Sequence, residues 1–313
     1  MRLKKPNFWD YKKPNLLSYL LLPLTFPFII NNFLLNIKKK NEKYKKIKTI
    51  CVGNIYVGGT AKTPLTIKIS NILNNLNIKT ATVKKYYPNQ IDEQNLLKKK
   101  TTLYCAHNRK IALNLALQDN YKVAIFDDGL QDTSINYDLS FVCFNSTKWV
   151  GNGFLIPSGP LREKLQSLSK YDVVFFNGNK EDISSLKIIV KKFNKDIKIF
   201  ETHYSPVNSD KFDKNNKYLI FSGIGNPDIF KKTLTENKLN IVKEIIFPDH
   251  YNYTKNDIDK IKMLAKNLNA KILTTEKDYV KIDSKDRHNI NFFEIELFIK
   301  DEDKLIDLLK LNI

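Results

Sequence analysis

The chain has 313 residues, of which 42% are hydrophobic and 27% are charged, so it is long enough for one large globular domain or two modest ones. This composition excludes collagen-like, disordered and disulfide-stapled proteins. The formal net charge is +19, but lysines are spread over every segment and no nucleic-acid-binding motif accompanies them. We therefore interpret the charge mainly as solvated surface, with anionic membrane or phosphorylated ligands as the alternative, and we expect no nucleic-acid partner.

The amino-terminal segment, residues 1–40, differs from the rest of the chain. Residues 16–35 form an apolar stretch that Pro23 and Pro27 interrupt and that lysine-rich segments flank. A transmembrane helix needs about 20 apolar residues, and a signal peptide would need a cleavage site of small residues after the stretch. We therefore expect an interfacial or shallowly inserted helix beside basic residues that face anionic lipid, with a buried core helix as the alternative.

Residues 41–208 are predicted to form an α/β domain. Residues 47–52 have the pattern of a short buried strand, a glycine-rich loop follows, and residues 62–76 have the apolar spacing of a helix. Further apolar strands, separated by helix-length segments, are predicted at residues 123–126, 139–144 and 173–176. This alternation predicts a parallel sheet with helices on both faces.

A polar stretch, residues 205–216, is the best candidate for a linker. Beyond it, strands with helices between them are predicted at residues 218–221, 241–247, 271–274 and 292–297. Residues 209–313 are therefore expected to form a second, smaller α/β lobe.

The loop GNIYVGGTAKT, from Gly53 to Thr63, has the composition and the strand-to-helix context of a phosphate-binding loop. Backbone N–H groups must converge on phosphate oxygens there, so residues with small side chains are needed where the chain wraps the phosphates. Lys62 would reach the β and γ phosphates of ATP, and Thr63 would offer its hydroxyl to Mg²⁺. The residues expected to bind the nucleotide through this loop are Gly58, Gly59, Thr60, Ala61, Lys62 and Thr63.

Two residues of the loop depart from the GxxxxGK[ST] pattern. Tyr56 stands where the first glycine would be, and Ala61 stands where the glycine before the lysine would be, so the loop by itself is also compatible with a simple turn. A second signal lies downstream, where an apolar strand ends in Asp127 and Asp128. A carboxylate at such a strand end can meet the same magnesium ion as Thr63, and together the two signals favour phosphoryl transfer.

Six motifs follow one another along the chain: VGNIYVGGTAKTP, FDDGLQ, PSGPLREKL, FSGIGNP, FPDHYNY and TTEKD. Together they resemble the tetraacyldisaccharide 4'-kinase family, which adds the 4'-phosphate to the lipid A precursor. The resemblance implies a P-loop NTPase-like kinase with two α/β lobes that uses ATP and Mg²⁺. It also implies a lipid-linked disaccharide substrate, peripheral or monotopic attachment to the cytoplasmic face of the bacterial inner membrane, and no obligate protein partner.

The resemblance assigns roles to particular residues. Lys62 corresponds to the phosphate-binding lysine, and Arg109 and Arg162 are expected to neutralise phosphate charge. The side chains expected near magnesium are those of Thr63, Asp127, Asp128 and Glu93.

The resemblance also implies a general base. The segment IDEQNLL is similar to the family's GDE stretch, so Asp92 is expected to accept the proton of the sugar hydroxyl. An unperturbed aspartate has a pKa of about 3.9 and is a weak base, so a neighbouring imidazole would help by orienting it. His250, in the sequence PDHY, is expected to be that partner. Without the resemblance, both would be interpreted as surface polar residues.

One segment departs clearly from the family. Residues 83–90, VKKYYPNQ, replace an SRGYG-like sequence, and Asn108 and Asp132 replace the usual Asp and His. The main alternative is therefore a degenerate, non-catalytic, membrane-associated P-loop protein of the same fold. A P-loop GTPase is a weaker alternative, because residues 274–278 lack the spacing of a guanine-binding N/T-K-x-D segment. We expect an active kinase.

Overall fold

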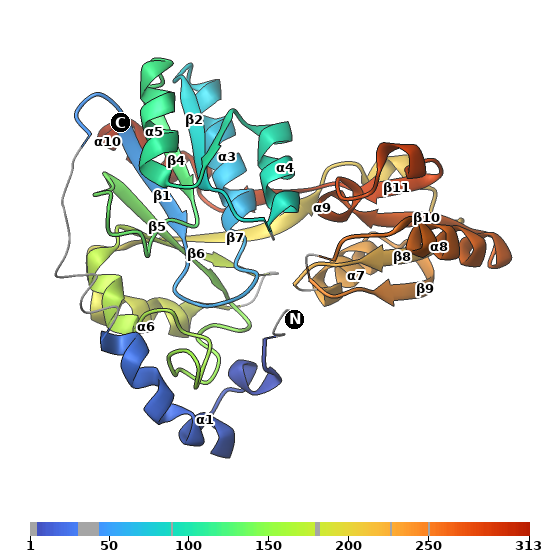
Figure 1. Cartoon of the computed structure of the whole chain (residues 1–313), viewed down its shortest axis with the longest axis horizontal. Coiled ribbons are helices and arrows are strands. Elements are labelled where there is room, and N and C mark those ends of the chain that lie inside the picture. The colour runs from blue at the N-terminus through green and yellow to red at the C-terminus, as the bar shows by residue number, and fades with distance from the viewer. Residues whose placement is uncertain (1–4, 31–43, 89, 179–181, 226, 250) are drawn as a thin grey trace. The chain divides into compact units, whose positions relative to one another are not determined.

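A computed structural model of the chain describes residues 5–30, 44–88, 90–178, 182–225, 227–249 and 251–313 (Figure 1). The chain divides into two compact units, and each is discontinuous in sequence. Unit 1 comprises Met1–Lys85, Thr101–His203 and Leu297–Ile313, and unit 2 comprises Tyr86–Lys100 and Tyr204–Glu296.

The sheet of unit 1 has eight strands in the order β12-β7-β6-β5-β1-β4-β2-β3. β1 pairs in parallel with β4 and β5, β2 with β3 and β4, and β6 with β5 and β7. The central strands are buried along nearly their whole length, which is the pattern of a parallel sheet covered on both faces. The strands are β1 Lys48–Gly53, β2 Thr80–Lys85, β3 Leu103–Ala106, β4 Val123–Asp127, β5 Leu139–Asn145, β6 Val173–Asn177, β7 Lys198–Pro206 and β12 Ile295–Ile299.

Helices pack on this sheet. α3 (Lys62–Asn75) contacts β1, β2 and β4. Residues Ala112, Leu113 and Ala116 of α5 (Arg109–Gln118) join the buried side chains of β1, β2 and β4, and Val190 of α6 (Ser184–Phe193) joins those of β5 and β6. The remaining helices of unit 1 with described bounds include η3 Leu165–Lys170 and α10 Glu302–Asn312.

Unit 2 has a four-stranded parallel sheet in the order β11-β10-β8-β9. Alternate residues of β8 face two different clusters, one with α8 and the other with α7, so a helix covers each face. The strands are β8 Lys217–Ser222, β9 Asn240–Ile246, β10 Ala270–Thr275 and β11 Ile290–Phe293. The helices are α4 Ile91–Lys100, α7 Pro227–Glu236, α8 Lys255–Asn267 and α9 Glu276–Tyr279, with 3-10 turns η4 Ser209–Lys211 and η5 Ser284–Asp286.

The predicted P-loop-like α/β fold is confirmed, but the division of the chain differs from the expected boundary at residues 208 and 209. α4 belongs to unit 2, where Lys99 lies 2.8 Å and Lys100 lies 3.3 Å from the carboxylate of Glu276. α10 belongs to unit 1, where Leu305 and Leu309 are fully buried. The single strand predicted at residues 292–297 is two strands, β11 and β12, one in each sheet.

The amino-terminal segment packs on the rest of unit 1 through a few side chains and exposes the others. The indole of Trp9 donates a hydrogen bond to the carbonyl of Pro157 at 2.9 Å, and Ser18 is buried against Asn152. Trp9 lies in η1 (Asn7–Asp10). Most of the apolar side chains of α1 (Leu16–Leu20) and η2 (Leu22–Leu24) are exposed. Within the described ranges, no helix is both long and apolar enough to cross a bilayer. The predicted segment 1–40 lies partly outside the described residues.

Candidate active site

The predicted phosphate-binding loop lies between β1 and α3, at the edge of the sheet where the parallel strands end. Gly58 has φ +147°, and a Cβ there would lie 3.0 Å from the ring of Tyr56. Ala61 has φ +66°, in the left-handed region that favours glycine. The chain thereby turns so that Lys62 and Thr63 begin the 14-residue helix α3. Backbone N–H groups in a first helical turn have no partner within the helix, so this turn is suited to phosphate oxygens.

The middle of the loop is tied to the end of β1. The side-chain amide of Asn54 donates to the hydroxyl of Thr60 at 2.9 Å and to the carbonyl of Gly58 at 3.4 Å. A Cβ at Gly59 would contact nothing within 4 Å, so packing does not require a glycine there. A small residue at this position instead keeps the backbone accessible.

Tyr56, which replaces the first glycine of the pattern, is buried outside the turn. Its ring packs against Leu155 and Leu161. Its hydroxyl donates a hydrogen bond to Asp10 and accepts one from Lys5. The tyrosine therefore links the loop to the amino-terminal segment, which gives a structural reason for this departure from the pattern.

Asp127 ends β4 and lies fully buried beside the first turn of α3. The hydroxyl of Thr63 is 3.2 Å from Asp127 Oδ2, and the hydroxyl of Thr66 is 3.3 Å from Oδ1. Lys84 Nζ, from β2, lies 2.5 Å from the same Oδ2. A hydroxyl and a carboxylate are oxygen ligands of the kind that Mg²⁺ prefers, so Thr63 and Asp127 fit the predicted metal.

Asp128 follows with φ +57° and binds cationic side chains. Its carboxylate accepts a hydrogen bond from Arg162 at 2.9 Å, and its carbonyl accepts one from Arg109. Burial alone would raise the pKa of Asp128, but the positive charges of Lys62, Arg162 and Lys84 outweigh burial and hold that pKa well below its usual range. The structure therefore brings both predicted arginines to the Asp127–Asp128 strand end.

The predicted base lies in unit 2, in the first turn of α4. The side chain of Asp92 is 5% exposed, and its Oδ2 lies 3.3 Å from Lys277 Nζ and 3.7 Å from Lys281 Nζ. Lys277 also lies 3.7 Å from both Glu93 and Asp249. Burial would lower the pKa of Lys277, but these three carboxylates raise it, so the lysine stays charged.

Sequence reasoning missed both lysines. Lys277 lies in the TTEKD segment and Lys281 shortly after it, nearly two hundred residues from Asp92 in the sequence. The only sequence signal for these lysines is that they lie four residues apart beside acidic residues. His250 lies outside the described residues. In the described part of the chain, no group of three or more His, Cys, Asp or Glu side chains is arranged to hold a metal ion. The metal roles of Asp128 and Glu93 stay predictions.

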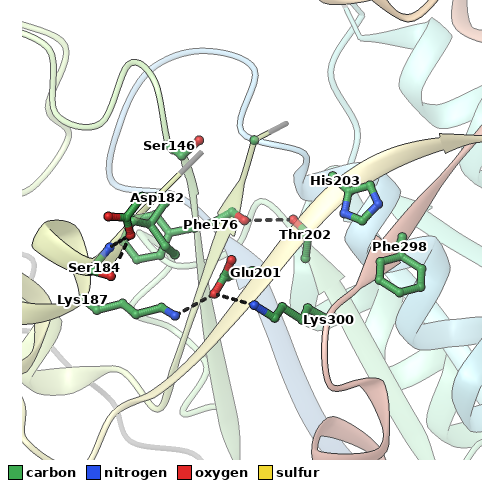
Figure 2. Close-up of a pocket in the computed structure, with 12 residues that line it drawn as sticks. Ser146, Phe176, Asp182, Ser184, Lys187, Glu201, Thr202, His203, Phe298 and Lys300 are labelled. Carbon is green, nitrogen blue, oxygen red and sulfur yellow. Dashed lines mark hydrogen bonds and ion pairs between the residues drawn. The ribbon is translucent and has the colours of Figure 1, made fainter. Parts of the chain in front are cut away.

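Unit 1 also has a cavity of about 490 Å³ at the carboxyl ends of β5, β6 and β7 (Figure 2). Ser146 and Gly178, which directly follow β5 and β6, line it together with Thr202, which pairs with the last residue of β6 from within β7. Figure 2 shows Lys187 and Lys300 directed toward Glu201, whose carboxylate lies 2.6 Å and 3.6 Å from their amines. The residues that line this cavity include none of the predicted site residues.

Comparisons with known proteins identify a matching family and similar proteins. Residues 17–313 match the family described as tetraacyldisaccharide-1-P 4'-kinase. A tetraacyldisaccharide 4'-kinase of Pelagibacter ubique is 50% identical over 314 residues, covering 100% of this chain and 99% of the relative. One of Rickettsia bellii is 38% identical, covering 91% and 92%. A crystal structure of LpxK from Aquifex aeolicus in complex with ATP has the same fold, with a TM-score of 0.71, 21% identity and coverage of 94% of this chain and 99% of the other.

Proposed function

The chain belongs to the tetraacyldisaccharide-1-P 4'-kinase family, and from this membership we propose that it transfers the γ-phosphoryl group of ATP to the 4'-hydroxyl of a lipid A precursor. The acceptor is a tetraacyldisaccharide 1-phosphate, and the product belongs to lipopolysaccharide biosynthesis. The observation that carries this function is the contact between Thr63, at the start of the helix after the glycine-rich loop, and Asp127, 3.2 Å away at the end of the neighbouring strand.

The residues of unit 1 are proposed to hold the triphosphate. Backbone N–H groups from Gly58 to Lys62 would bind phosphate oxygens, and Lys62 would neutralise the charge that develops on the γ-phosphoryl group. Arg162 and Arg109 already lie at Asp128, so they would add positive charge at the same strand end. Thr63 and Asp127 would hold a magnesium ion bound together with ATP, and the ion would supply positive charge that offsets the charge of the phosphates.

Asp92 is proposed to accept the proton of the sugar hydroxyl. The ammonium groups of two lysines lie within 4 Å of this carboxylate. Lys277 and Lys281 would fix the orientation of the carboxylate, and proximity of a correctly oriented base supplies much of its effect. The role predicted for His250, to orient Asp92, stays part of the proposal.

The amino-terminal segment is proposed to hold the enzyme on the cytoplasmic face of the inner membrane. Leu16, Leu20 and Phe26 expose 75%, 65% and 64% of their surface, which is unusual for large apolar side chains near one another. Lys12 and Lys13 precede them, so apolar and cationic groups would meet lipid tails and anionic headgroups together. Attachment would be peripheral or monotopic.

A phosphoryl-transfer assay tests this function. Purified protein with detergent-dispersed tetraacyldisaccharide 1-phosphate and MgATP should yield the bisphosphorylated lipid. Lys62→Ala should lower kcat/KM at least ~100-fold, the size of a lost electrostatic contact to the transition state. The matched control is Lys122→Ala, an exposed lysine at the opposite end of β4, which should leave the rate unchanged.

A non-catalytic protein of the same fold is the alternative, and one observation favours it: Lys84 holds the carboxylate expected at the metal. Absence of product from the wild-type chain, with the lipid shown to be dispersed and MgATP shown to bind, would support this alternative. An equal rate in Lys62→Ala and the wild type would instead remove the phosphate-binding loop from the mechanism.

A further inference from the structure

Lys84 and Asp127 form an ion pair that is almost completely excluded from water. Their side chains are 1% and 0% exposed, and the amine lies 2.5 Å from Oδ2. Asp127 is the last residue of β4 and Lys84 the last but one of β2, and these two strands pair in parallel with Val83 opposite Phe126. A buried charge costs free energy unless it is paired, so each of these groups compensates the charge of the other and holds it in place.

The ion pair changes the charge of the whole nucleotide site. Thr63 contacts the carboxylate oxygen that Lys84 also contacts, so the ammonium lies where the charge of a metal ion would act on Asp127. Asp128 is likewise paired with Arg162. Lys84 therefore offsets the charge of Asp127 and Arg162 offsets that of Asp128, so each of these carboxylates already has a cation beside it.

We propose that Lys84 supplies part of the positive charge that magnesium otherwise brings, so that the site binds a nucleoside triphosphate before the metal and has little affinity for free divalent cations. This inference rests on the proposed function, because it concerns the same ATP site. Lys84 acts on the triphosphate through its charge and on Asp127 by direct contact, so it is a positioning residue.

The size of the effect follows from electrostatics. At an effective dielectric constant of about 20, one unit charge within ~10 Å of the phosphates changes binding by roughly tenfold. The wild type should therefore bind ATP in EDTA with an affinity within ~10-fold of that for MgATP. Mg²⁺ alone should show no binding at millimolar concentration.

Isothermal titration calorimetry of the full chain tests the proposal, with ATP in EDTA, ATP with excess Mg²⁺, and Mg²⁺ alone as titrants. Lys84→Met keeps the length of the side chain and removes its charge, so it should weaken metal-free ATP binding at least ~10-fold and MgATP binding no more than ~3-fold. Lys84→Arg should behave as the wild type. Lys122→Met, the control at the far end of β4, should change neither affinity.

Lys84→Met leaves a buried carboxylate without its cation, so it can fail to fold. The double variant Lys84→Met/Asp127→Asn removes both charges, leaves the net charge unchanged, and should keep metal-free ATP affinity within ~3-fold of the wild type.

The outcomes separate this inference from the function on which it rests. If the wild type binds MgATP but binds metal-free ATP more than ~100-fold more weakly, the role of Lys84 is wrong and the kinase function stands. Equal losses of both affinities in a folded Lys84→Met would also overturn it, because they indicate a structural role only. If the wild type does not bind MgATP, the proposed function itself fails.

Discussion

Ala61 adopts a left-handed backbone conformation, φ +66°, immediately before Lys62. This conformation costs a residue with a Cβ roughly 1–2 kcal/mol, whereas glycine adopts it without steric penalty. The strain is local to the turn that begins α3, so it bears directly on the residues proposed to hold phosphate.

We therefore expect Ala61→Gly to stabilise unit 1 by about 0.5–1 kcal/mol, after the greater chain entropy of glycine in the unfolded state is subtracted. Urea unfolding monitored by circular dichroism measures this change. Ala112→Gly, in the buried interior of α5, is the control and should destabilise, because its φ is helical. Destabilisation by Ala61→Gly would show that the alanine methyl contributes more through packing than its conformation costs.

At the scale of elements, α4 and α9 are held together by charge. Lys277, in α9, lies 3.3 Å from Asp92 in α4, while Lys99 in α4 lies 2.8 Å from Glu276 in α9. In one ion pair the lysine comes from α9, and in the other it comes from α4. Together the two pairs fix the rotation of α4 about its own axis, and this rotation determines the direction of the Asp92 carboxylate.

Lys277→Met should therefore lower kcat by roughly 10- to 100-fold and leave the KM for ATP within ~3-fold, because the base is misoriented while the nucleotide loop is intact. Lys277→Arg should restore part of kcat. Lys285→Met, an exposed lysine of the same unit, is the matched control. A rise in the KM for ATP with an unchanged kcat would contradict the positioning role.

The exposed apolar side chains of the amino-terminal helices make a second prediction at this scale. Substitution of Leu16, Leu20 and Phe26 together by Gln should lower partitioning onto anionic vesicles by roughly 100-fold, because each side chain loses about 1 kcal/mol or more of apolar burial in lipid. The fold should persist, since these side chains are exposed whereas Trp9 and Ser18 make the contacts with the rest of unit 1, at Pro157 and Asn152.

Vesicle sedimentation measures this partitioning. Replacement of Ile188 and Leu311 by Gln removes equally exposed apolar side chains from other helices and should have no effect. Equal sedimentation of the triple variant and the wild type would exclude these residues as the membrane contact.

The bounds of helices and strands were predicted best where they depend on the pattern of apolar residues within one short segment. β1, α3 and β4 lie within a residue of their predicted bounds, because apolar strands and helical spacing are properties of short segments. β2 was missed because it carries buried polar residues such as Lys84, whose partner Asp127 is far away in sequence. The contacts of Asp92 with Lys277 were missed for the same reason, since no local pattern encodes an ion pair between distant helices.

At the scale of the whole chain, unit 2 is largely an insertion within a hairpin of unit 1. β7 and β12 are neighbours in the eight-stranded sheet, and the backbone N–H of Lys300 donates to the carbonyl of Glu201 at 2.9 Å. Most of unit 2, Tyr204–Glu296, connects these two strands. A boundary near residue 208, as the sequence predicts, would therefore remove part of unit 1.

A fragment of residues 1–208 should consequently fail to fold cooperatively. It lacks Ile299, Leu305 and Leu309, which are fully buried, and each contributes about 1.5–3 kcal/mol by burial. This loss is comparable to the whole stability of a typical domain, roughly 5–15 kcal/mol.

By contrast, residues 1–203 joined to 297–313 through a short Gly-Asn-containing loop should unfold in a single cooperative transition, because the join closes a hairpin between strands that already pair. Thermal unfolding of both proteins tests this prediction. If the 1–208 fragment unfolds as cooperatively and at the same midpoint temperature as the joined protein, β12 and α10 are dispensable and the chain does divide at residue 208.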